Sequence, residues 1–393
     1  MRKTIAVVTS SRADYSHLYW LMRDLAAHPE IDLKILVMAS HLSPEFGNTV
    51  REIETDGFTI AARIECLLSS DTDVGMAKSI GVGVLSLADA LGAMRPDLLL
   101  LIADRYEMLA PAAVALALRI PIAHIEGGEL SEGAIDDAVR NALTKMSHIH
   151  FTSTENARRR VISMGEEPWR VHRAGAPSLD HLRRSAMLDT RRLEAELEVD
   201  LSRPTVLVAY HPVTLLSDTL AEADALFEAL AGVPQQILFC YPNADAGSRS
   251  LIERTESFLR ARGDGRVFVN LPAIWYWSLL RHVQVMVGNS SSGIMETGSL
   301  RLPTVNVGLR QKGRERPQNV LDARASAISI LETLRRAQSA SFRQSIAAMV
   351  NPYGDGHASE RILEVLSDLP RRDQLLMKQA VMVEDDEHTP IRT

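Results

Sequence analysis

The amino-acid sequence predicts an α/β fold with two doubly wound, Rossmann-like domains that face each other across a cleft. Three observations lead to this prediction. Short runs rich in β-branched residues or leucine alternate with longer segments of helical period, a pattern typical of parallel βαβ units. One charged segment, Asp180–Arg203, interrupts this alternation about midway. The length of 393 residues is enough for two domains of ordinary size.

The predicted elements form two series, one on each side of the charged segment. The first begins with the strand Ile5–Thr9 and the helix Tyr15–Ala27, and its further strands are Leu33–Met38, Leu98–Ile102, Pro121–Ile125 and Ile149–Thr152. The strands of the second are Thr205–Tyr210, Gln236–Cys240, Val267–Asn270, Val283–Val287 and Thr304–Val307. We therefore predict an N-terminal domain at 1–180 and a C-terminal domain at 204–370. The acidic residues 371–393 are expected to form a poorly ordered tail.

The composition argues against several classes of partner and site. Lys and Arg number 43 against 50 Asp and Glu, and the resulting net charge of −7 gives no reason to expect nucleic acid or an anionic membrane surface. The two cysteines, Cys66 and Cys240, have no CxxC spacing, which argues against a zinc site and fits a reducing cytosol. The longest uncharged apolar run, Met108–Leu118, is shorter than the roughly 20 residues of a membrane span. Met1–Lys3 leads into the first strand without a signal peptide, and we expect a cytoplasmic protein.

Polar residues follow five of the predicted strands. In open parallel sheets, ligands bind beyond the carboxyl ends of the strands, so these residues are expected to meet in one site. The segments that follow the strands are Ser10–Asp14, Asp104–Arg105, Glu126–Glu129, His211–Pro212 and Gly288–Gly293. Their convergence on one edge of each sheet predicts an active site in the cleft.

Three carboxylates near these strand ends, Asp104, Glu126 and Asp136, suit acid–base chemistry. The alternative is a structural ion pair, Asp104 with Arg105 or Asp136 with Arg140. His211 follows a strand and precedes a proline, where it could be a neutral hydrogen-bond partner or a charged stabiliser of a leaving diphosphate.

The segment Asn289–Gly293 lies between a buried strand and the predicted helix Ile294–Leu300, so its N–H groups and hydroxyls are placed to hold a diphosphate. A plain serine N-cap is the alternative. The loop Leu309–Pro317 carries Arg310 and Arg314, which suit phosphate or uracil contact unless the loop is simply solvated.

Some nucleotide and metal sites are disfavoured. The sequence has no GxxxxGK[ST], which argues against a P-loop nucleotidase, and no GxGxxG opens the first helix, which argues against a dinucleotide site. His124, Glu126 and His148 lack the spacing of a metal motif such as HExxH. We expect neither a metal nor a cofactor.

Several segments together resemble the hydrolysing UDP-N-acetylglucosamine 2-epimerases, which are found in bacterial sialic-acid pathways and as the epimerase half of the bifunctional animal enzyme. These segments are Ser11–Ser16, Ser40–Leu42, Ala103–Glu107, His124–Glu129, Ile135–Arg140, Thr144–His148, His211–Thr214, Gly288–Gly293 and Asn351–Gly356. The non-hydrolysing relatives typically carry an HxEAGLR-like segment in place of His124–Glu129, so the resemblance is to the hydrolysing type.

The resemblance implies the fold of B-type glycosyltransferases and a two-step reaction. UDP is eliminated to give a 2-acetamidoglycal, and water then adds with reprotonation at C2 from the other face. Asp104, Glu126 and Asp136 would serve the acid–base steps, and His211 would lie at the leaving-group side. By the same resemblance, the diphosphate would contact Ser291, Ser292 and Gly293, the ribose Glu296, the nucleotide Arg310, and the phosphate and sugar region Arg12 and His41. Family members are commonly dimers or tetramers, so a homo-oligomer is expected.

The substrate has two candidates. One is UDP-N-acetylglucosamine, which would give free N-acetylmannosamine for sialic acid, and the other is UDP-2,4-diacetamido-2,4,6-trideoxyglucose of the legionaminic acid pathway. A glycosyltransferase of the same architecture and a non-catalytic nucleotide-sugar sensor are further alternatives. Two features depart from the family: the loop Glu129–Ala134 is one residue longer than in some members, and Ala103 replaces a usual Gly, which leaves the turn feasible if φ there is negative.

Overall fold

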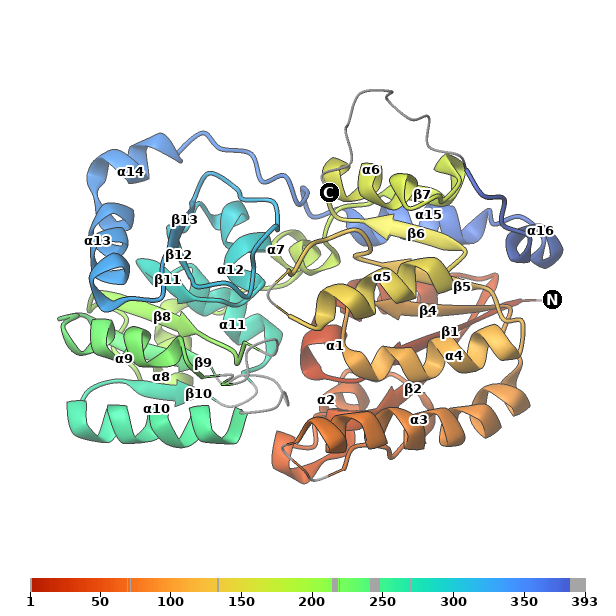
Figure 1. Ribbon diagram of the computed structural model, residues 1–393, viewed down its shortest axis with the longest axis horizontal. Helices are drawn as coiled ribbons and strands as arrows, with labels where there is room; N and C mark the ends of the chain where they lie inside the picture. Colours follow the sequence, from red (N-terminus) through yellow and green to blue (C-terminus); the bar gives the residue numbers. More distant parts are fainter. Residues whose placement is uncertain are drawn as a thin grey trace, which may run out of the picture.

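The computed structural model describes residues 2–68, 70, 72–132, 134–213, 218, 220–240, 248–268 and 271–381. In this part of the chain, two α/β units lie side by side, each built on one sheet (Figure 1). The N-terminal sheet has the order β3-β2-β1-β4-β5-β6-β7 and the C-terminal sheet the order β10-β9-β8-β11-β12-β13. All the pairs of neighbouring strands are parallel. The predicted fold class is confirmed.

The N-terminal sheet is covered by helices on both faces. Its strands are β1 (Lys3–Thr9), β2 (Ile31–Met38), β3 (Ile60–Ile64), β4 (Leu98–Ile102), β5 (Ile122–Ile125), β6 (Ile149–Thr152) and β7 (Val171–Arg173). Every residue of β4 is buried, which explains why its sequence is an unbroken apolar run. Its helices are α1 (Arg12–Ala27) and α2 (Val50–Thr55), which pack on one face, α3 (Asp73–Met94), α4 (Leu109–Ala117) and α5 (Asp136–Met146), which pack on the other, and α6 (Glu155–Ser163).

The C-terminal sheet is built in the same way. Its strands are β8 (Thr205–Ala209), β9 (Gln236–Cys240), β10 (Arg266–Phe268), β11 (Val285–Gly288), β12 (Thr304–Val307) and β13 (Val320–Ala323). The helices α9 (Ala223–Ala231) and α13 (Ala327–Gln338) cover one face, and α8 (Thr190–Leu197), α11 (Ala273–Leu280) and α12 (Ser292–Met295) the other. Three further helices are α7 (Asp180–Arg184) between the units, α10 (Ser248–Arg262) and α14 (Ala340–Ser345).

The last helices return to the N-terminal unit. Helix α15 (Ala358–Ser367) and helix α16 (Arg372–Leu376) appear in blue among the red and yellow elements of that unit in Figure 1. Ile362, Leu366 and Leu375 belong to the same core as α1. The predicted limits, 1–180 and 204–370, assign α15 to the C-terminal domain, although it packs on the N-terminal unit. Helix α16 belongs to the predicted tail, so the first part of this tail is folded. Residues 382–393 lie outside the described residues.

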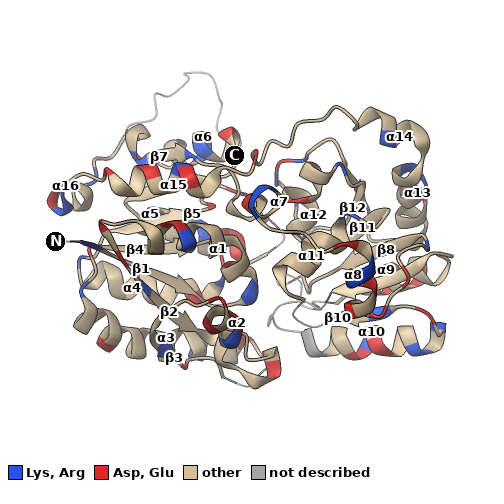
Figure 2. Ribbon diagram, turned by 180° about the vertical axis from the view of Figure 1, so that it is seen from behind, with Lys and Arg blue, Asp and Glu red and all other residues tan. Residues whose placement is uncertain are grey.

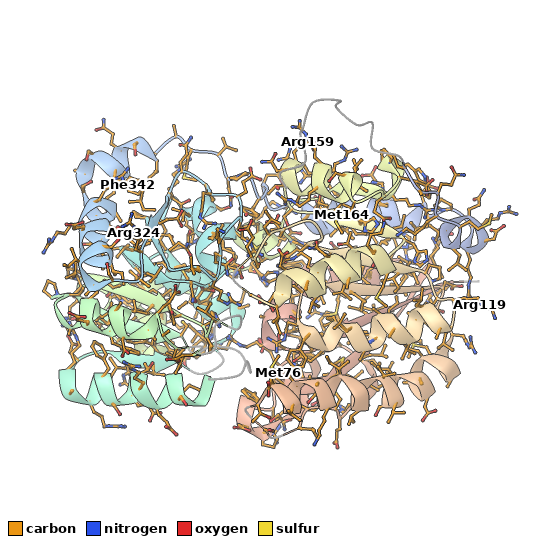
Figure 3. The ribbon with its side chains drawn as sticks, viewed as in Figure 1. Met76, Arg119, Arg159, Met164, Arg324 and Phe342 are labelled. Atoms are coloured by element: carbon orange, nitrogen blue, oxygen red, sulfur yellow. The ribbon has the colours of Figure 1, made fainter. Side chains whose placement is uncertain are left out.

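The charged residues are spread over the surface. Acidic and basic residues are interspersed along the helices of both units (Figure 2), and the labelled Arg119, Arg159 and Arg324 are exposed (Figure 3). Among the described residues, α3 is long and apolar enough to cross a membrane by length and composition, with 28% of its most apolar window buried. Core helices of globular proteins pass the same test. Helix α3 packs against α4 and contributes Leu87 and Leu91 to the core.

Candidate active site

Two adjoining cavities lie where the carboxyl ends of the two sheets face each other. The larger has a volume of about 160 Å³ and the smaller about 90 Å³. Both are lined by Ala13, His17, Ser291, Met295 and Arg310, so they form one cleft with contributions from both units. Of the predicted site residues, the larger cavity is lined by Arg12, His211, Ser291, Ser292, Glu296 and Arg310, and the smaller by Asp104, Glu126, Asp136, Ser291, Arg310 and Arg314.

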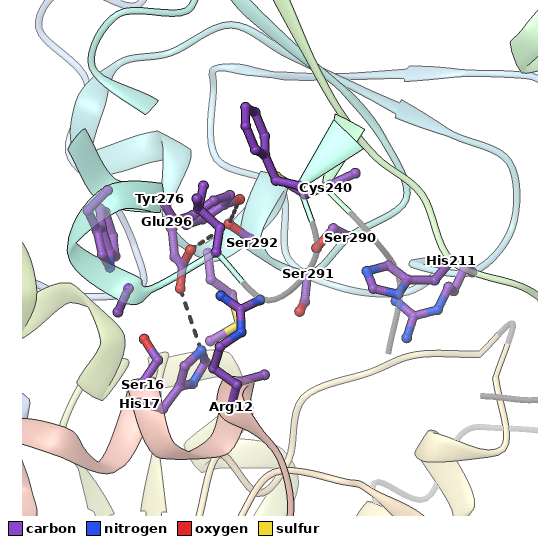
Figure 4. Close-up of a pocket in the computed structure, with 18 residues that line it drawn as sticks. Arg12, Ser16, His17, His211, Cys240, Tyr276, Ser290, Ser291, Ser292 and Glu296 are labelled. Atoms are coloured by element: carbon purple, nitrogen blue, oxygen red, sulfur yellow. Dashed lines mark hydrogen bonds and ion pairs between the residues drawn. The ribbon is translucent and has the colours of Figure 1, made fainter. Parts of the chain in front are cut away.

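The turn before α1 places Arg12 in the cleft. Asp14 Oδ2 accepts hydrogen bonds from the backbone N–H of Ser10 at 3.0 Å and of Ser11 at 3.1 Å, and Ser11 caps the helix. The capping box begins α1 beside the sheet edge, and Arg12 extends from it toward the Ser291–Ser292 turn (Figure 4). Burial lowers the pKa of the Arg12 guanidinium, and its Nε has no hydrogen-bond partner among the described residues. Arg12 is thus placed to receive an anion.

His41 and Gly293 line neither cavity. The His41 side chain is fully buried and makes hydrogen bonds with Thr9 Oγ1 at 2.9 Å and Thr49 Oγ1 at 2.7 Å. Burial lowers the pKa of His41 to about 4, so the ring is neutral. These contacts fix the loop after β2 against β1. Gly293 lies beneath the serine turn, where an added Cβ would be 3.0 Å from Thr304 Cγ2.

The carboxylates after β4 and β5 are held by strained turns. Ala103 has φ of 61° and Glu126 has φ of 66°, values that are costly for residues other than Gly. The sequence analysis expected the turn to be feasible for Ala103 if its φ were negative, and the φ is positive. The carbonyl of Ala103 bonds with His124 Nε2 at 2.8 Å, and the Glu126 N–H donates to the Phe151 carbonyl at 2.7 Å.

Asp104 and Asp136 both pair with arginines that the sequence analysis did not name for them. Asp104 pairs with Arg140, a fully buried side chain that also donates to the Glu129 carbonyl at 2.8 Å. Asp136 lies 3.6 Å from Arg310 Nη2, across the cleft. Arg105, in contrast, pairs with Glu107 at 2.8 Å. Arginine thus positions two of the three carboxylates, and one of these pairs joins the two units.

A residue that the sequence analysis missed, His17, contacts Glu126. Its Nδ1 lies 2.9 Å from Glu126 Oε1 and its Nε2 lies 3.5 Å from Glu296 Oε1. Burial alone would lower the pKa of His17, but the two carboxylates outweigh it and raise the pKa to about 10. His17 therefore carries a positive charge. His17 follows Ala13 by four residues, so the two lie on one face of α1. This helical spacing was the sequence signal that could have identified His17 as a site residue.

The serine turn is anchored by a close approach of β11 to β8. Gly288 has φ of 142°, and an added Cβ would lie 2.0 Å from the Ala209 carbonyl oxygen. The buried Asn289 side chain accepts from the His211 N–H at 2.7 Å and donates to the His211 carbonyl at 2.8 Å. The Asn289 carbonyl in turn accepts from Arg310 Nη1 at 3.2 Å. These hydrogen bonds thus hold together His211, the turn that contains Ser291 and Ser292, and the loop that carries Arg310. Thr214, at the end of the His211 motif, lies outside the described residues.

The two ends of the cleft differ in chemistry. The larger cavity is lined by serine hydroxyls with Arg12, Arg310 and Glu296, and the smaller by four carboxylates, Asp14, Asp104, Glu126 and Asp136, with Arg105, Arg310 and Arg314. Such an arrangement can hold an anionic group at one end while proton transfers take place at the other. No group of three or more His, Cys, Asp or Glu side chains suited to a metal ion occurs in the described part of the chain.

Comparison with known proteins identifies the family. The sequence profile described as UDP-N-acetylglucosamine 2-epimerase matches residues 23–367. The chain belongs to this family. It is therefore an enzyme of the UDP-sugar 2-epimerase type.

Two relatives of this epimerase are named as hydrolysing enzymes. The UDP-N,N'-diacetylbacillosamine 2-epimerase of Legionella pneumophila is 36% identical, with 96% of this chain and 99% of the relative covered. The GDP/UDP-N,N'-diacetylbacillosamine 2-epimerase of Campylobacter jejuni is 34% identical, with 88% and 90% covered.

The epimerase also resembles solved structures, at identities that show the fold alone. The UDP-GlcNAc 2-epimerase of Neisseria meningitidis bound to UDP-GlcNAc has a TM-score of 0.76 and 17% identity, with 93% of this chain and 99% of that chain covered. A second solved structure, of a protein from Listeria monocytogenes, has a TM-score of 0.77 and 16% identity, with 93% of this chain and 96% of that chain covered.

Proposed function

We propose that this epimerase cleaves UDP from an N-acetylated UDP-sugar and releases the free sugar with inverted C2. The observation that carries the proposal is the cleft itself, in which a cavity lined by Arg12, Arg310 and serine hydroxyls adjoins a cavity lined by Asp104, Glu126 and Asp136. A nucleotide sugar has the same polarity, because its diphosphate is anionic and the reacting C1 and C2 atoms follow directly after it.

The diphosphate is proposed to lie between Arg12 and the Ser291–Ser292 turn, with Arg310 on its other side. Both guanidinium groups face the same cavity. Glu296 is proposed to accept hydrogen bonds from the ribose hydroxyls, and Arg314 to support the sugar end, where it lines the smaller cavity. Gly293 allows the turn to pack against Thr304. His41 is proposed to act through the loop after β2 that it anchors.

The acid–base steps are assigned to Asp104, Glu126 and Asp136. In the elimination, a carboxylate takes the proton from C2, the C1–O bond to UDP breaks, and a C1–C2 double bond forms. In the second step, water adds its oxygen to C1 and a carboxyl group returns a proton to C2 from the opposite face. His211, which lines the larger cavity, is proposed to stabilise the leaving diphosphate.

The proposed substrate is UDP-N,N'-diacetylbacillosamine. This compound is the same as UDP-2,4-diacetamido-2,4,6-trideoxyglucose, the legionaminic acid precursor named above as one of the two candidates. Relatives named for this substrate are 34% and 36% identical to the chain. UDP-N-acetylglucosamine, with N-acetylmannosamine as product, is the second candidate, because a UDP-N-acetylglucosamine 2-epimerase of Neisseria meningitidis is 30% identical over 85% of the chain.

The test compares both UDP-sugars with the purified protein in the absence of an acceptor. Phosphorus NMR follows UDP, and proton NMR identifies the sugar. We expect UDP and a free 2-epimerised sugar, with faster release from the diacetamido substrate. Faster release from UDP-N-acetylglucosamine would reverse the substrate assignment. No release from either would contradict the proposed hydrolysing reaction and favour a glycosyltransferase.

We further propose a cytoplasmic homo-oligomer. Both cysteines are free thiols, as expected in a reducing compartment. Helices α3 and α4 expose large apolar side chains, with Val74 58%, Leu85 74% and Leu116 54% exposed, and a second copy of the chain would cover this surface. Light scattering of the purified protein gives its mass, and a monomer of 43.4 kDa would contradict the oligomer.

A further inference from the structure

One histidine joins carboxylates from the two units of the epimerase. His17 lies on α1 of the N-terminal unit, in the wall that the two cavities share. Its Nδ1 contacts Glu126 Oε1 at 2.9 Å, in the N-terminal unit, and its Nε2 contacts Glu296 Oε1 at 3.5 Å, in the C-terminal unit. Figure 4 shows His17 below Glu296, with a dashed line between them. The His17 side chain is 19% exposed, and the two glutamate side chains are 6% and 7% exposed.

The contact continues into the larger cavity, where the nucleotide is proposed to bind. Ser292 Oγ donates to Glu296 Oε2 at 2.5 Å, and the Tyr276 hydroxyl lies 2.5 Å from Ser292 Oγ. A continuous series of polar contacts thus links Glu126, His17, Glu296, Ser292 and Tyr276. This series begins at Glu126 in the smaller cavity and reaches Ser292 and Tyr276, which line the larger cavity.

The charges around His17 favour its protonated form. Glu126 and Glu296 raise the pKa of His17 to about 10 despite its burial. His181 and Tyr276 are two other titratable rings nearby. Burial lowers the pKa of His181, and its Nε2 bonds with the Ser16 carbonyl at 2.9 Å. Further charged residues that line the two cavities with His17 are Arg12, Asp14, Asp104, Arg105, Asp136, Arg310 and Arg314.

We propose that His17 is a positioning residue that holds the acid–base carboxylate Glu126 and couples it to Glu296 in the larger cavity. The inference rests on the proposed function for the role of Glu126. A nucleotide that bonds with Glu296 competes with His17 Nε2 for this carboxylate. The altered contact at Nε2 affects the contact between Nδ1 of the same ring and Glu126. The reaction end therefore responds to occupation of the nucleotide end.

Two variants separate charge from hydrogen bonding. His17→Gln keeps a polar side chain without the charge, and His17→Lys restores a cation. We expect His17→Gln to lower kcat at least tenfold, with KM changed less than threefold, and to move the acidic limb of the pH–rate profile to higher pH. His17→Lys should return the limb toward its wild-type position. The matched control is His357→Gln, since His357 is 42% exposed and pairs with Glu360 outside the cleft. An unchanged pH profile in His17→Gln would overturn the proposal.

Histidine NMR of the full chain tests the ring without any turnover. The resonance that disappears in His17→Gln identifies His17. We expect this ring to remain protonated at pH 8 and its chemical shift to move when UDP is added. Titration of the ring near pH 6.5, or no response to bound UDP, would overturn the inference. If the wild-type protein releases no UDP from either sugar but the ring behaves as expected, the proposed function fails and the coupling of the two carboxylates stands.

Discussion

Replacement of Glu126 by Gln tests the carboxylate end of the cleft with the least change in structure. The amide has nearly the size of the carboxyl group, and its oxygen can still accept the His17 hydrogen bond that now spans 2.9 Å. The backbone bond to Phe151 and the φ of 66° do not depend on the side-chain charge. The change therefore removes the capacity to transfer a proton and leaves the fold in place.

The expected loss follows from that capacity. General acid–base catalysis contributes about 10²- to 10⁴-fold in rate, or about 3–5 kcal/mol of transition-state stabilisation. We expect kcat of Glu126→Gln to fall by that factor. Glu126 does not line the larger cavity, so UDP should still bind, and the Kd for UDP should change much less than kcat does.

UDP release followed by phosphorus NMR gives the rate, and isothermal calorimetry gives UDP binding. Glu155→Gln is the matched control, because Glu155 is 40% exposed on α6 and pairs with arginines of its own helix. Wild-type turnover in Glu126→Gln would refute the assignment of Glu126. Loss of both the fold and UDP binding would show instead that Glu126 acts mainly in stability.

Further predictions concern the neighbouring positions. Asp104→Asn should lower kcat at least about 100-fold while UDP still binds, as measured by the same two assays. Gly288→Ala places a Cβ 2.0 Å from a backbone oxygen, so thermal melting should show a loss of stability and calorimetry a loss of UDP binding. Gly92→Ala, on α3 with nothing within 4 Å of the added Cβ, should gain about 0.5–1 kcal/mol. Burial raises the pKa of Glu129 to about 7 from 4.5, so the folded state binds this proton more tightly and stability falls as pH rises between these values. Glu129→Gln should remove up to about 3 kcal/mol of that fall in denaturant titrations at pH 5 and pH 7.5.

The fold class and the position of the cleft could be predicted from the sequence because they depend on local patterns. Strands buried on both faces read as apolar runs, as in Leu98–Ile102, and in parallel sheets the residues that follow them gather at one edge. The short outer strands β3, β7 and β13 were not predicted. The pattern of β3, Ile60–Ile64, mixes apolar with exposed positions, and β7 has only three residues.

The interactions that complete the cleft depend on tertiary structure and could not be predicted. Arg140 pairs with Asp104, 36 residues earlier, although Asp136 is nearer in the sequence. His17 reaches Glu296 only because the two units meet at this point. Helical period shows that α15 has an apolar face, but it does not show which sheet that face covers, and the return of α15 to the N-terminal unit was therefore missed.

The most direct test of the elimination and hydration proposed here is the reaction of the wild-type protein with UDP-N,N'-diacetylbacillosamine in deuterated water. Proton loss and return at C2 would place one deuterium at that carbon of the free sugar and leave the other ring carbons unlabelled. We predict full C2 labelling in a product with inverted C2, together with one UDP for each sugar. Release of an unlabelled sugar with its original C2 configuration would contradict the account, because it would show simple hydrolysis of the glycosidic bond.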